Sequence, residues 1–307
     1  MSWVELYLNG KTEAVDWVCT LLAATTYTND IHIDESRNTK DDWTFTICFY
    51  LANDIYASKR IQEINNLLSP LQRTGLTSEI QAYVVTEKKD NVDISNFPVR
   101  IGKRFVILSP EAVYQSQAEE ISLRLKTSLA FGSGLHPATI LAMRLLEKYV
   151  TPKMNSLDLG SGSGILSIAI AKLGGQVLAL DSDSIAVEST QDAVERNAVA
   201  QQVKVMRGSL GKGSEMGHWM GGDILGDITT IVPNGSFDLI AANIFGRVHT
   251  TLAPEYRQAL RSGGMLVTSG FNHEYEESVM TALQQEGFEL VEEERLGEWI
   301  ALIFRNR

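Results

Sequence analysis

Residues 157–165 read LDLGSGSGI, and this stretch decides how the second half of the chain folds. Three glycines, Gly160, Gly162 and Gly164, occupy alternate positions directly after an apolar run. A helical pattern, GILSIAIAKLG, follows at once. Because glycine permits a tight turn and lets a ligand press on bare backbone, the stretch predicts a ligand-binding turn between a buried strand and a helix.

The alternation of strand and helix patterns continues through the rest of the chain. The apolar strand patterns NSLDL, QVLALD, VKVMR, FDLIAAN and GMLVTS are separated by helical ones, which is typical of a parallel, doubly wound sheet. After the helical pattern HEYEESVMTALQQEG, the segment FELVEEERLGEWIALIFR reads as two strands joined at Gly297. We therefore expect an α/β, Rossmann-like sheet of seven strands over residues 126–307, with the last strand antiparallel and a glycine-rich insertion at 208–235.

The first part of the chain has a different pattern. In residues 1–95 the strand patterns WVELYL, WTFTICFYL and QAYVVTE alternate with two helical ones, AVDWVCTLLAA and SKRIQEINNLLSPL. This order favours a small α+β domain, most simply a ferredoxin-like one. Residues 96–125 follow as a predicted linker with a basic cluster, and a solvated surface is the simpler interpretation of that cluster.

Composition narrows the class of protein. The 307 residues carry 27 Lys and Arg against 38 Asp and Glu, a net charge of −11, which disfavours a nucleic-acid binder and suits a basic partner. Two cysteines, Cys19 and Cys48, are too few for a disulfide framework, so a reducing, cytoplasmic setting is expected. We find no signal-peptide pattern, no apolar run of about 20 residues and no metal-ligand spacing, so neither a membrane span nor a metal site is predicted.

The residues around the glycine turn indicate what it binds. A dinucleotide fingerprint needs a third glycine where Ile165 stands, and a phosphate-binding loop needs Lys-Ser/Thr after Gly164; both are missing. Asp181 ends the second strand, where an acidic side chain accepts hydrogen bonds from ribose hydroxyls, while Asp183 is better placed to cap the next helix. A nucleoside without a phosphate fits both observations, namely adenosine with a methionine-like tail.

Longer blocks carry a family resemblance. LDLGSGSGILSIAIAKLGG together with LALDSD resembles the S-adenosyl-L-methionine (AdoMet) binding core of class I methyltransferases. The whole chain is similar to the bacterial methyltransferases of large-subunit ribosomal protein L-eleven, in LAFGSGLHPATILAMRLLE (129–147), in residues 157–199 and in the block from FDLIAANIFG to residue 271. It departs from that family at residues 126–128, where Lys-Thr-Ser replaces Asp-Pro-Gly, and at Phe245 and Gly246, which replace Leu-Ala.

The resemblance implies a function and a set of site residues. The expected enzyme transfers methyl groups from AdoMet to lysine side-chain or N-terminal amines of that ribosomal protein, and its N-terminal domain holds the substrate. Asn243 would be catalytic, with its carboxamide oxygen accepting a hydrogen bond from the amine. By its position before Gly160, Asp158 would either orient the glycine turn by hydrogen bonding to its backbone or be a buried, paired acid, and His136 is more simply structural. The residues expected to bind AdoMet are Thr139, Gly160, Gly162, Asp181, Asn243, Phe131 and Gly132.

The residues leave some alternatives open. The acceptor could be another protein or a small molecule, because substrate-contacting residues are the least similar to the family. A non-catalytic AdoMet-binding module and an NAD-dependent oxidoreductase are less well supported, the first because Asn243 is present and the second because the fingerprint glycine is absent. A basic ribosomal protein is the expected partner, with no nucleic acid or membrane, and the oligomeric state is not determined by the sequence.

Overall fold

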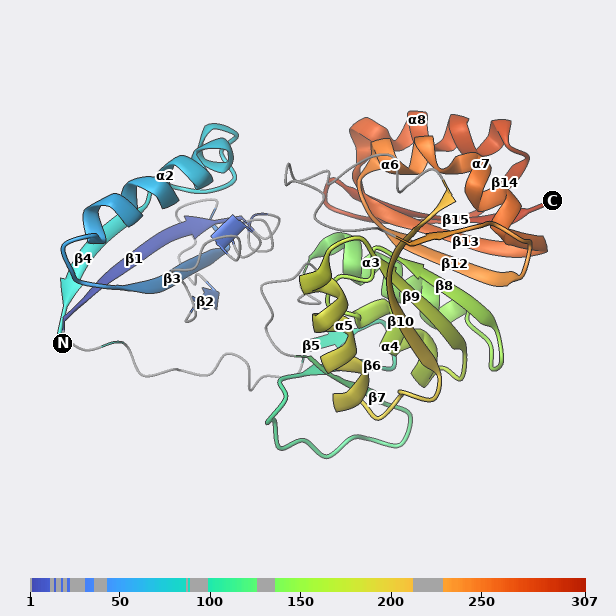
Figure 1. The fold of residues 1–307 in the computed structure, drawn as a ribbon, viewed down its shortest axis with the longest axis horizontal. Coiled ribbons are helices and arrows are strands. Elements are labelled where there is room, and N and C mark those ends of the chain that lie inside the picture. Colours follow the sequence, from blue (N-terminus) through green and yellow to red (C-terminus); the bar gives the residue numbers. More distant parts are fainter. Residues whose placement is uncertain are drawn as a thin grey trace. The chain divides into compact units, whose positions relative to one another are not determined.

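The structure is a computed structural model that describes residues 2–11, 14, 18, 21–22, 31–35, 43–86, 88, 99–125, 136–211 and 229–307. The chain divides into two compact units, Met1–Phe97 with Leu129–His136, and Pro98–Ser128 with Pro137–Arg307. We describe each unit by itself (Figure 1). No helix in the described ranges is both long and apolar enough to cross a membrane.

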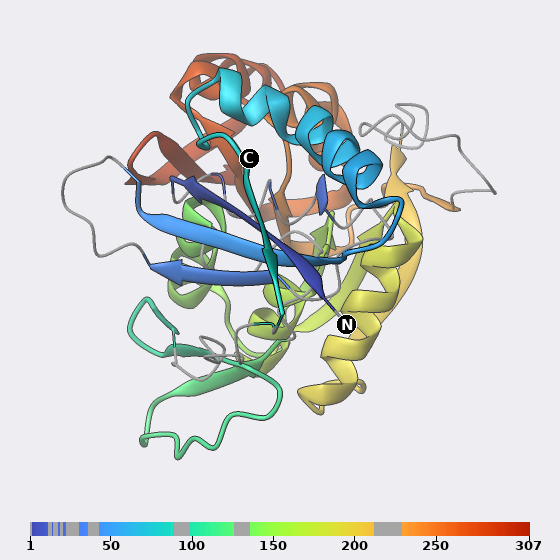
Figure 2. The same cartoon turned by 90° about the vertical axis from the view of Figure 1, so that its left-hand side faces the viewer.

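The first unit is a four-stranded antiparallel sheet with helix α2 (Ala57–Arg73) on one face (Figures 1 and 2). Alternate residues of β1 turn Val4, Leu6 and Leu8 into a core with Ile64 and Leu68 of α2. The strands are ordered β2-β3-β1-β4 in the sheet. Their bounds are β1 (Trp3–Gly10), β2 (Ile31–Glu35), β3 (Phe45–Ala52) and β4 (Gln81–Val85).

The sequence pattern predicts three of these strands but not β2, a five-residue strand paired with β3. The expected helix between β1 and β2 falls largely outside the described residues. The ferredoxin-like arrangement therefore stays a prediction.

The second unit is built on an eight-stranded sheet ordered β11-β10-β9-β8-β12-β13-β15-β14. The pairs from β11 to β13 are parallel, and β15 lies antiparallel between β13 and β14. The bounds are β8 (Asn155–Leu159), β9 (Gln176–Asp181), β10 (Val203–Leu210), β11 (Thr229–Ile231), β12 (Phe237–Asn243), β13 (Leu260–Asn272), β14 (Phe288–Leu296) and β15 (Trp299–Asn306).

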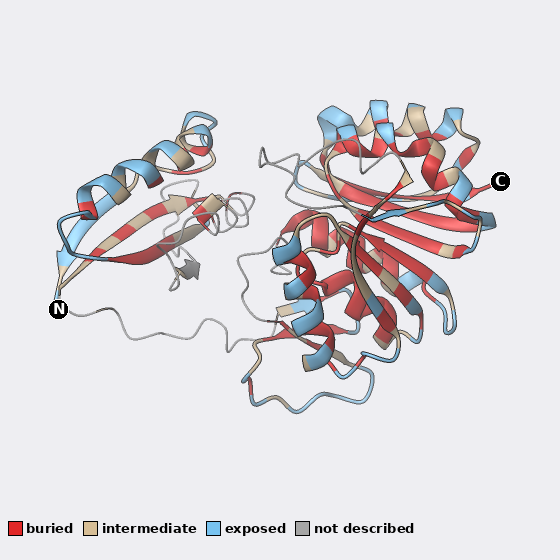
Figure 3. Cartoon of the chain, in the orientation of Figure 1, coloured by how far each residue is buried: buried red, intermediate tan, exposed pale blue. Residues whose placement is uncertain are grey.

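Helices cover both faces of this sheet, so its central strands are buried on both sides (Figure 3). On one face, α3 (Pro137–Tyr149), α4 (Ile165–Lys172) and α5 (Ser184–Arg196) pack into one apolar core. On the other, α6 (Gly246–Thr251), α7 (Ala253–Ala259) and α8 (His273–Gln285) pack into a second core. This confirms the predicted α/β fold with an antiparallel last strand. The sheet has one strand more than expected, because the three residues of β11, within the predicted glycine-rich insertion, pair with the end of β10.

Residues 99–124 differ from the expected linker. They form three strands, β5 (Val99–Ile101), β6 (Phe105–Leu108) and β7 (Ile121–Arg124), which pair as one small sheet. Ile101, Phe105 and Leu123 are buried in the same core as α3 and α4. Of the predicted basic cluster, Arg100, Lys103 and Arg104, Arg100 forms an ion pair with Glu120. Residues 99–124 are thus held in the second unit by a few apolar side chains within a largely polar segment.

Candidate functional site

The strand order reverses between β8 and β12. From β8 the chain proceeds outward through β9 and β10, and from β12 it proceeds the opposite way through β13. Ligands of such sheets bind at the carboxyl ends of the strands at this point. Leu159 of β8 lies opposite Ala242 of β12, so the glycine turn and Asn243 emerge side by side. The two sequence features that were expected to form one site are therefore adjacent.

The glycine turn depends on glycine at its first position. Gly160 has a φ of 77°, in the left-handed region, and a Cβ there would lie 2.5 Å from the Ile244 side chain. The backbone N–H groups of Gly160 and Ser161 both donate to the Leu180 carbonyl, at 2.8 and 3.0 Å. A side chain at position 160 would therefore both strain the backbone and displace the residue after Asn243.

Thr190 of α5 secures the turn from the other side, and the sequence analysis did not identify it. Its hydroxyl donates to the Gly162 carbonyl at 3.0 Å. The Ser161 hydroxyl lies 3.0 Å from the Thr190 oxygen and donates to it, because the single hydroxyl hydrogen of Thr190 is already used. Thr190 lies three or four positions from the buried Ala186, Val187 and Ala193. This helical spacing was the sequence feature that could have placed its hydroxyl on the buried face of α5.

Asp181 joins the second strand to the turn. Its carboxylate accepts from the Gly162 N–H at 2.9 Å and from the Asp183 N–H at 3.0 Å. Asp183 caps α5 as predicted, since its side chain accepts from Ile185 N–H. Burial raises the pKa of Asp181, and hydrogen bonds from the backbone N–H groups of Asp183, Gly162 and Ser182 oppose that rise. A carboxylate has about four acceptor positions, so Asp181 retains capacity for a further donor, such as a ribose hydroxyl.

Asn243 is fixed by hydroxyls from two elements. Its amide nitrogen donates to Thr139 of α3 at 3.1 Å, and its amide oxygen accepts from Ser269 of β13 at 3.0 Å. Ser269 lies beside Asn243 in the register of β12 and β13. Two predicted residues, Asn243 and Thr139, are thereby brought together although 104 positions separate them. Ser269 is a further contact that the sequence analysis missed, because nothing local marks a serine in a strand.

Asp158 does not orient the glycine turn in the way expected. Its Oδ2 accepts from the Ser167 hydroxyl of α4 at 2.5 Å, and its Oδ1 has no hydrogen-bond partner among the described residues. Burial raises the pKa of Asp158 to about 7, and the Ser167 hydrogen bonds oppose the rise. The hydrogen-bond donor to Asp158 is thus Ser167 of α4 and not a backbone N–H of the glycine turn.

The raised pKa of Asp158 predicts a specific pH dependence. The folded protein holds this proton more tightly than the unfolded chain, so the group's stabilising contribution is complete below about pH 4 and is lost as the pH rises through about 7. Asp158→Asn removes this titration. We expect the free energy of unfolding of the variant, relative to wild type, to increase between pH 4 and pH 8, as measured by chemical denaturation. Parallel pH profiles for the two proteins would contradict this.

The remaining predicted residues fall into two groups. Phe131 and Gly132 lie outside the described residues. Burial lowers the pKa of His136 to about 4, so its ring is neutral at physiological pH, in keeping with a structural role. Within the described ranges, no cluster of His, Cys, Asp and Glu has a metal-binding arrangement.

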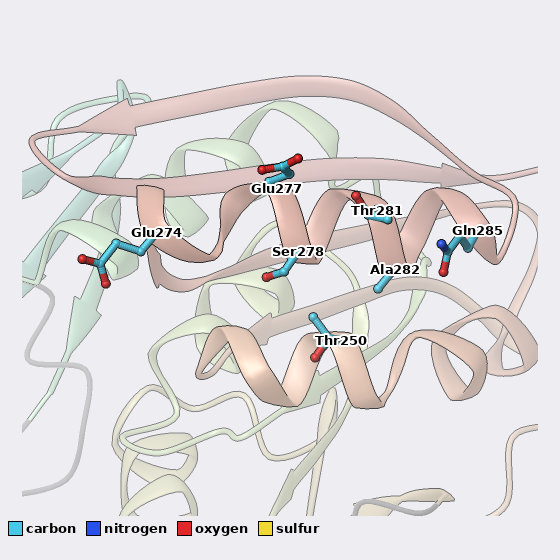
Figure 4. Close-up of a pocket in the computed structure, with 7 residues that line it drawn as sticks. All are labelled: Thr250, Glu274, Glu277, Ser278, Thr281, Ala282 and Gln285. Atoms are coloured by element: carbon cyan, nitrogen blue, oxygen red, sulfur yellow. The ribbon is translucent and has the colours of Figure 1, made fainter.

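A surface hollow between α6 and α8 lies apart from these residues (Figure 4). It is lined by Thr250, Glu274, Glu277, Ser278, Thr281, Ala282 and Gln285. None of these side chains belongs to the strand ends that carry Gly160, Asp181 and Asn243, so the hollow is not part of the candidate site.

Comparison with known proteins identifies the family. The family model described as ribosomal protein L11 methyltransferase (PrmA) matches residues 2–307. The chain belongs to this family. The ribosomal protein L11 methyltransferase of Chloroflexus aurantiacus is 39% identical, with 99% of this chain and 98% of the relative aligned. That of Herpetosiphon aurantiacus is 36% identical over 100% of this chain and 99% of the relative.

A solved structure supports the same assignment. The crystal structure of a ribosomal protein L11 methylase from Lactobacillus delbrueckii subsp. bulgaricus matches with a TM-score of 0.55 and 27% identity, over 68% of this chain and 99% of that one. The predicted resemblance is therefore confirmed, and this member of the L11 methyltransferase family is an AdoMet-dependent methyltransferase. The oxidoreductase and the non-catalytic module are set aside.

The residues present fit AdoMet. Gly160 begins a tight turn directly after β8, and the Asp181 carboxylate retains acceptor capacity beside that turn. Thr139 accepts from Asn243, so its own hydroxyl hydrogen is not used in that bond. The described part of the site thus offers backbone, a carboxylate and a hydroxyl to a nucleoside that carries an amino-acid tail.

Proposed function

We propose that this enzyme methylates ribosomal protein L11, at lysine side-chain amines, its N-terminal amine or both. Curated relatives that align over their whole length with this chain are named for that substrate. The observation that carries the amine chemistry is the fixed carboxamide of Asn243 beside the glycine turn, with both its ends held by hydroxyls. A cytoplasmic setting and a basic protein partner belong to the same proposal.

The roles of the site residues follow from their hydrogen-bonding capacity. AdoMet, when bound, supplies an electrophilic methyl group. Gly160, Gly162 and Asp181 would hold its nucleoside, and Thr139 would donate to it. The Asn243 oxygen accepts one hydrogen bond from Ser269 and retains a second lone pair. That lone pair would accept an N–H of the incoming amine and so direct the nitrogen lone pair toward the methyl group.

The amine has to be neutral before it can react. A lysine amine has a reference pKa of about 10.4, and a dry site lowers it by disfavouring the charged form. Asn243 suits this requirement, because an amide oxygen accepts from a neutral amine without introducing a charge that would raise the amine pKa again.

The direct test is methylation of purified L11 with labelled AdoMet, followed by mass-spectrometric mapping of the modified positions. We expect label on lysine or N-terminal amines of L11 and none on an equimolar mixture of other ribosomal proteins. Label found instead on another protein or on small molecules would reject L11 as the acceptor while leaving the methyltransferase chemistry in place.

We also propose that the first unit, predicted as residues 1–95, recruits the protein substrate. Apart from Phe131 and Gly132, which lie outside the described residues, none of the residues that we place in the AdoMet site belongs to the first unit. The first unit has its own core and its own sheet. These features support a module that binds the protein substrate and contributes little to the binding of AdoMet.

Truncation tests this division of labour. A fragment of residues 98–307 is expected to bind AdoMet with near wild-type affinity while its kcat/KM for L11 falls about tenfold or more, since binding energy from a remote contact is lost. A shorter fragment, 120–307, removes β5 and β6 with their buried Ile101 and Phe105, and is expected to unfold more readily. Calorimetric titration and thermal unfolding report on both fragments. Full activity of the 98–307 fragment on L11 would overturn the proposed role.

A further inference from the structure

A buried histidine lies directly behind the residues that hold Asn243. His249 of α6 is fully buried, and its Nε2 lies 2.9 Å from the Ser269 carbonyl oxygen. Its ring packs edge-on against Phe271, with centroids 5.4 Å apart. The hydrogen-bond and ring partners of His249 are Ser269, Tyr256 and Phe271, so residues other than the glycine turn and Asp181 account for its position.

The partners of His249 select one form of its ring. A carbonyl oxygen only accepts, so Nε2 carries the hydrogen and donates to Ser269. Nδ1 is then an acceptor, and the hydroxyl of the fully buried Tyr256 lies 3.3 Å from it as donor. Burial lowers the pKa of His249 to about 4, which keeps the ring neutral. Tyr256, His249 and Ser269 thus form a chain in which each donor points toward β13.

This chain fixes the backbone that carries the Ser269 hydroxyl. The Ser269 carbonyl accepts two hydrogen bonds, one from His249 and one from the Ile244 N–H at 3.0 Å. The next residue, Gly270, has a φ of 90°, and a Cβ there would lie 2.5 Å from the Ile244 carbonyl oxygen. The backbones at the ends of β12 and β13 are therefore in close contact. This contact restricts the position of the Ser269 hydroxyl relative to Asn243.

We propose that His249 is a positioning residue for methyl transfer: by holding the Ser269 carbonyl, it places the Ser269 hydroxyl on the Asn243 oxygen and so fixes the direction in which Asn243 presents its remaining lone pair. This inference rests on the proposed role of Asn243. The contribution of His249 is to orientation, so it acts on the rate of transfer and not on AdoMet binding.

Two substitutions distinguish the effect of losing the His249 hydrogen bond from the effect of changing the volume of its ring. His249→Phe keeps a planar ring and removes the donor, whereas His249→Gln places an amide N–H close to the position of Nε2. We expect His249→Phe to lower kcat with L11 about tenfold, as for neighbours coupled through one hydrogen-bond network. His249→Gln should recover most of this loss, and the dissociation constant for AdoMet should stay within about twofold of wild type in both. Thr250→Ala, on the same helix without a contact to Ser269, serves as the matched control and should match wild type.

A double-mutant cycle with Asn243→Ala decides between positioning and simple support of the fold. If His249 acts through Asn243, His249→Phe lowers kcat when Asn243 is present and has little further effect when it is absent. Equal losses in both backgrounds, or a His249→Gln variant as slow as His249→Phe, would overturn the proposal. If His249→Phe does not fold, Ser269→Ala replaces it in the double-mutant cycle. This substitution removes only the Ser269 hydroxyl that donates to Asn243.

The same measurements distinguish this inference from the function on which it rests. A wild-type rate for Asn243→Ala would reject the proposed role of Asn243 and with it the need for positioning. A slow Asn243→Ala variant beside an unimpaired His249→Phe variant would reject the role of His249 alone.

Discussion

Asn243→Ala is expected to lower the rate constant for methyl transfer by about 10²-fold or more, while AdoMet affinity stays close to wild type. The carboxamide contacts the amine mainly as the transition state forms, so its loss acts on turnover. The nucleoside is held elsewhere, by the glycine turn and Asp181. Removal also leaves the hydroxyls of Thr139 and Ser269 without their amide partner, which adds a modest loss of stability.

Single-turnover kinetics with saturating AdoMet and L11 measure this rate directly. Asn155→Ala is the matched control, because Asn155 begins β8 at the opposite end of the strand from the glycine turn and bonds to the Ser236 carbonyl. A wild-type rate for Asn243→Ala would show that Asn243 only completes the strand end and that another group positions the amine.

Asp181→Ala is expected to weaken AdoMet binding by about 1.5–3 kcal/mol, roughly a 10- to 150-fold rise in the dissociation constant, the usual contribution of a hydrogen bond to a charged acceptor. The structure adds a second cause, because the same carboxylate accepts from the N–H of Gly162 within the turn. Both causes act on binding, so the rate constant at saturating AdoMet should change much less than the affinity.

Calorimetric titration of AdoMet and its demethylated product tests this expectation. Asp183→Ala is the matched control: it removes the cap of α5, at a cost of about 1 kcal/mol in stability, and should leave the affinity nearly unchanged. Thermal unfolding separates the two effects. An Asp181→Ala variant with wild-type affinity would show that Asp181 serves only to join β9 to the turn and to α5.

Local sequence patterns were sufficient to predict the features that depend on neighbouring residues. The glycine turn, the alternation of strands and helices, and the acidic residue at the end of β9 each depend on residues a few positions apart, so local patterns reveal them. Family resemblance added Thr139 and Asn243 as separate predictions. The resemblance also implied the methyl donor, whereas the strand and helix patterns had already predicted the α/β fold; the comparisons confirm both.

The distant groups that complete the site could be identified from the packed fold alone. Thr190, Ser269 and His249 lie in an ordinary helix, an apolar strand and a short helix, and each acquires its role from a partner brought close by the sheet order. Residues 99–124 belong to the second unit because their few apolar side chains are buried in its core. The local sequence pattern does not indicate that burial. Buried polar groups have to be paired, and which partner is available is a property of the packed fold, not of the neighbouring sequence.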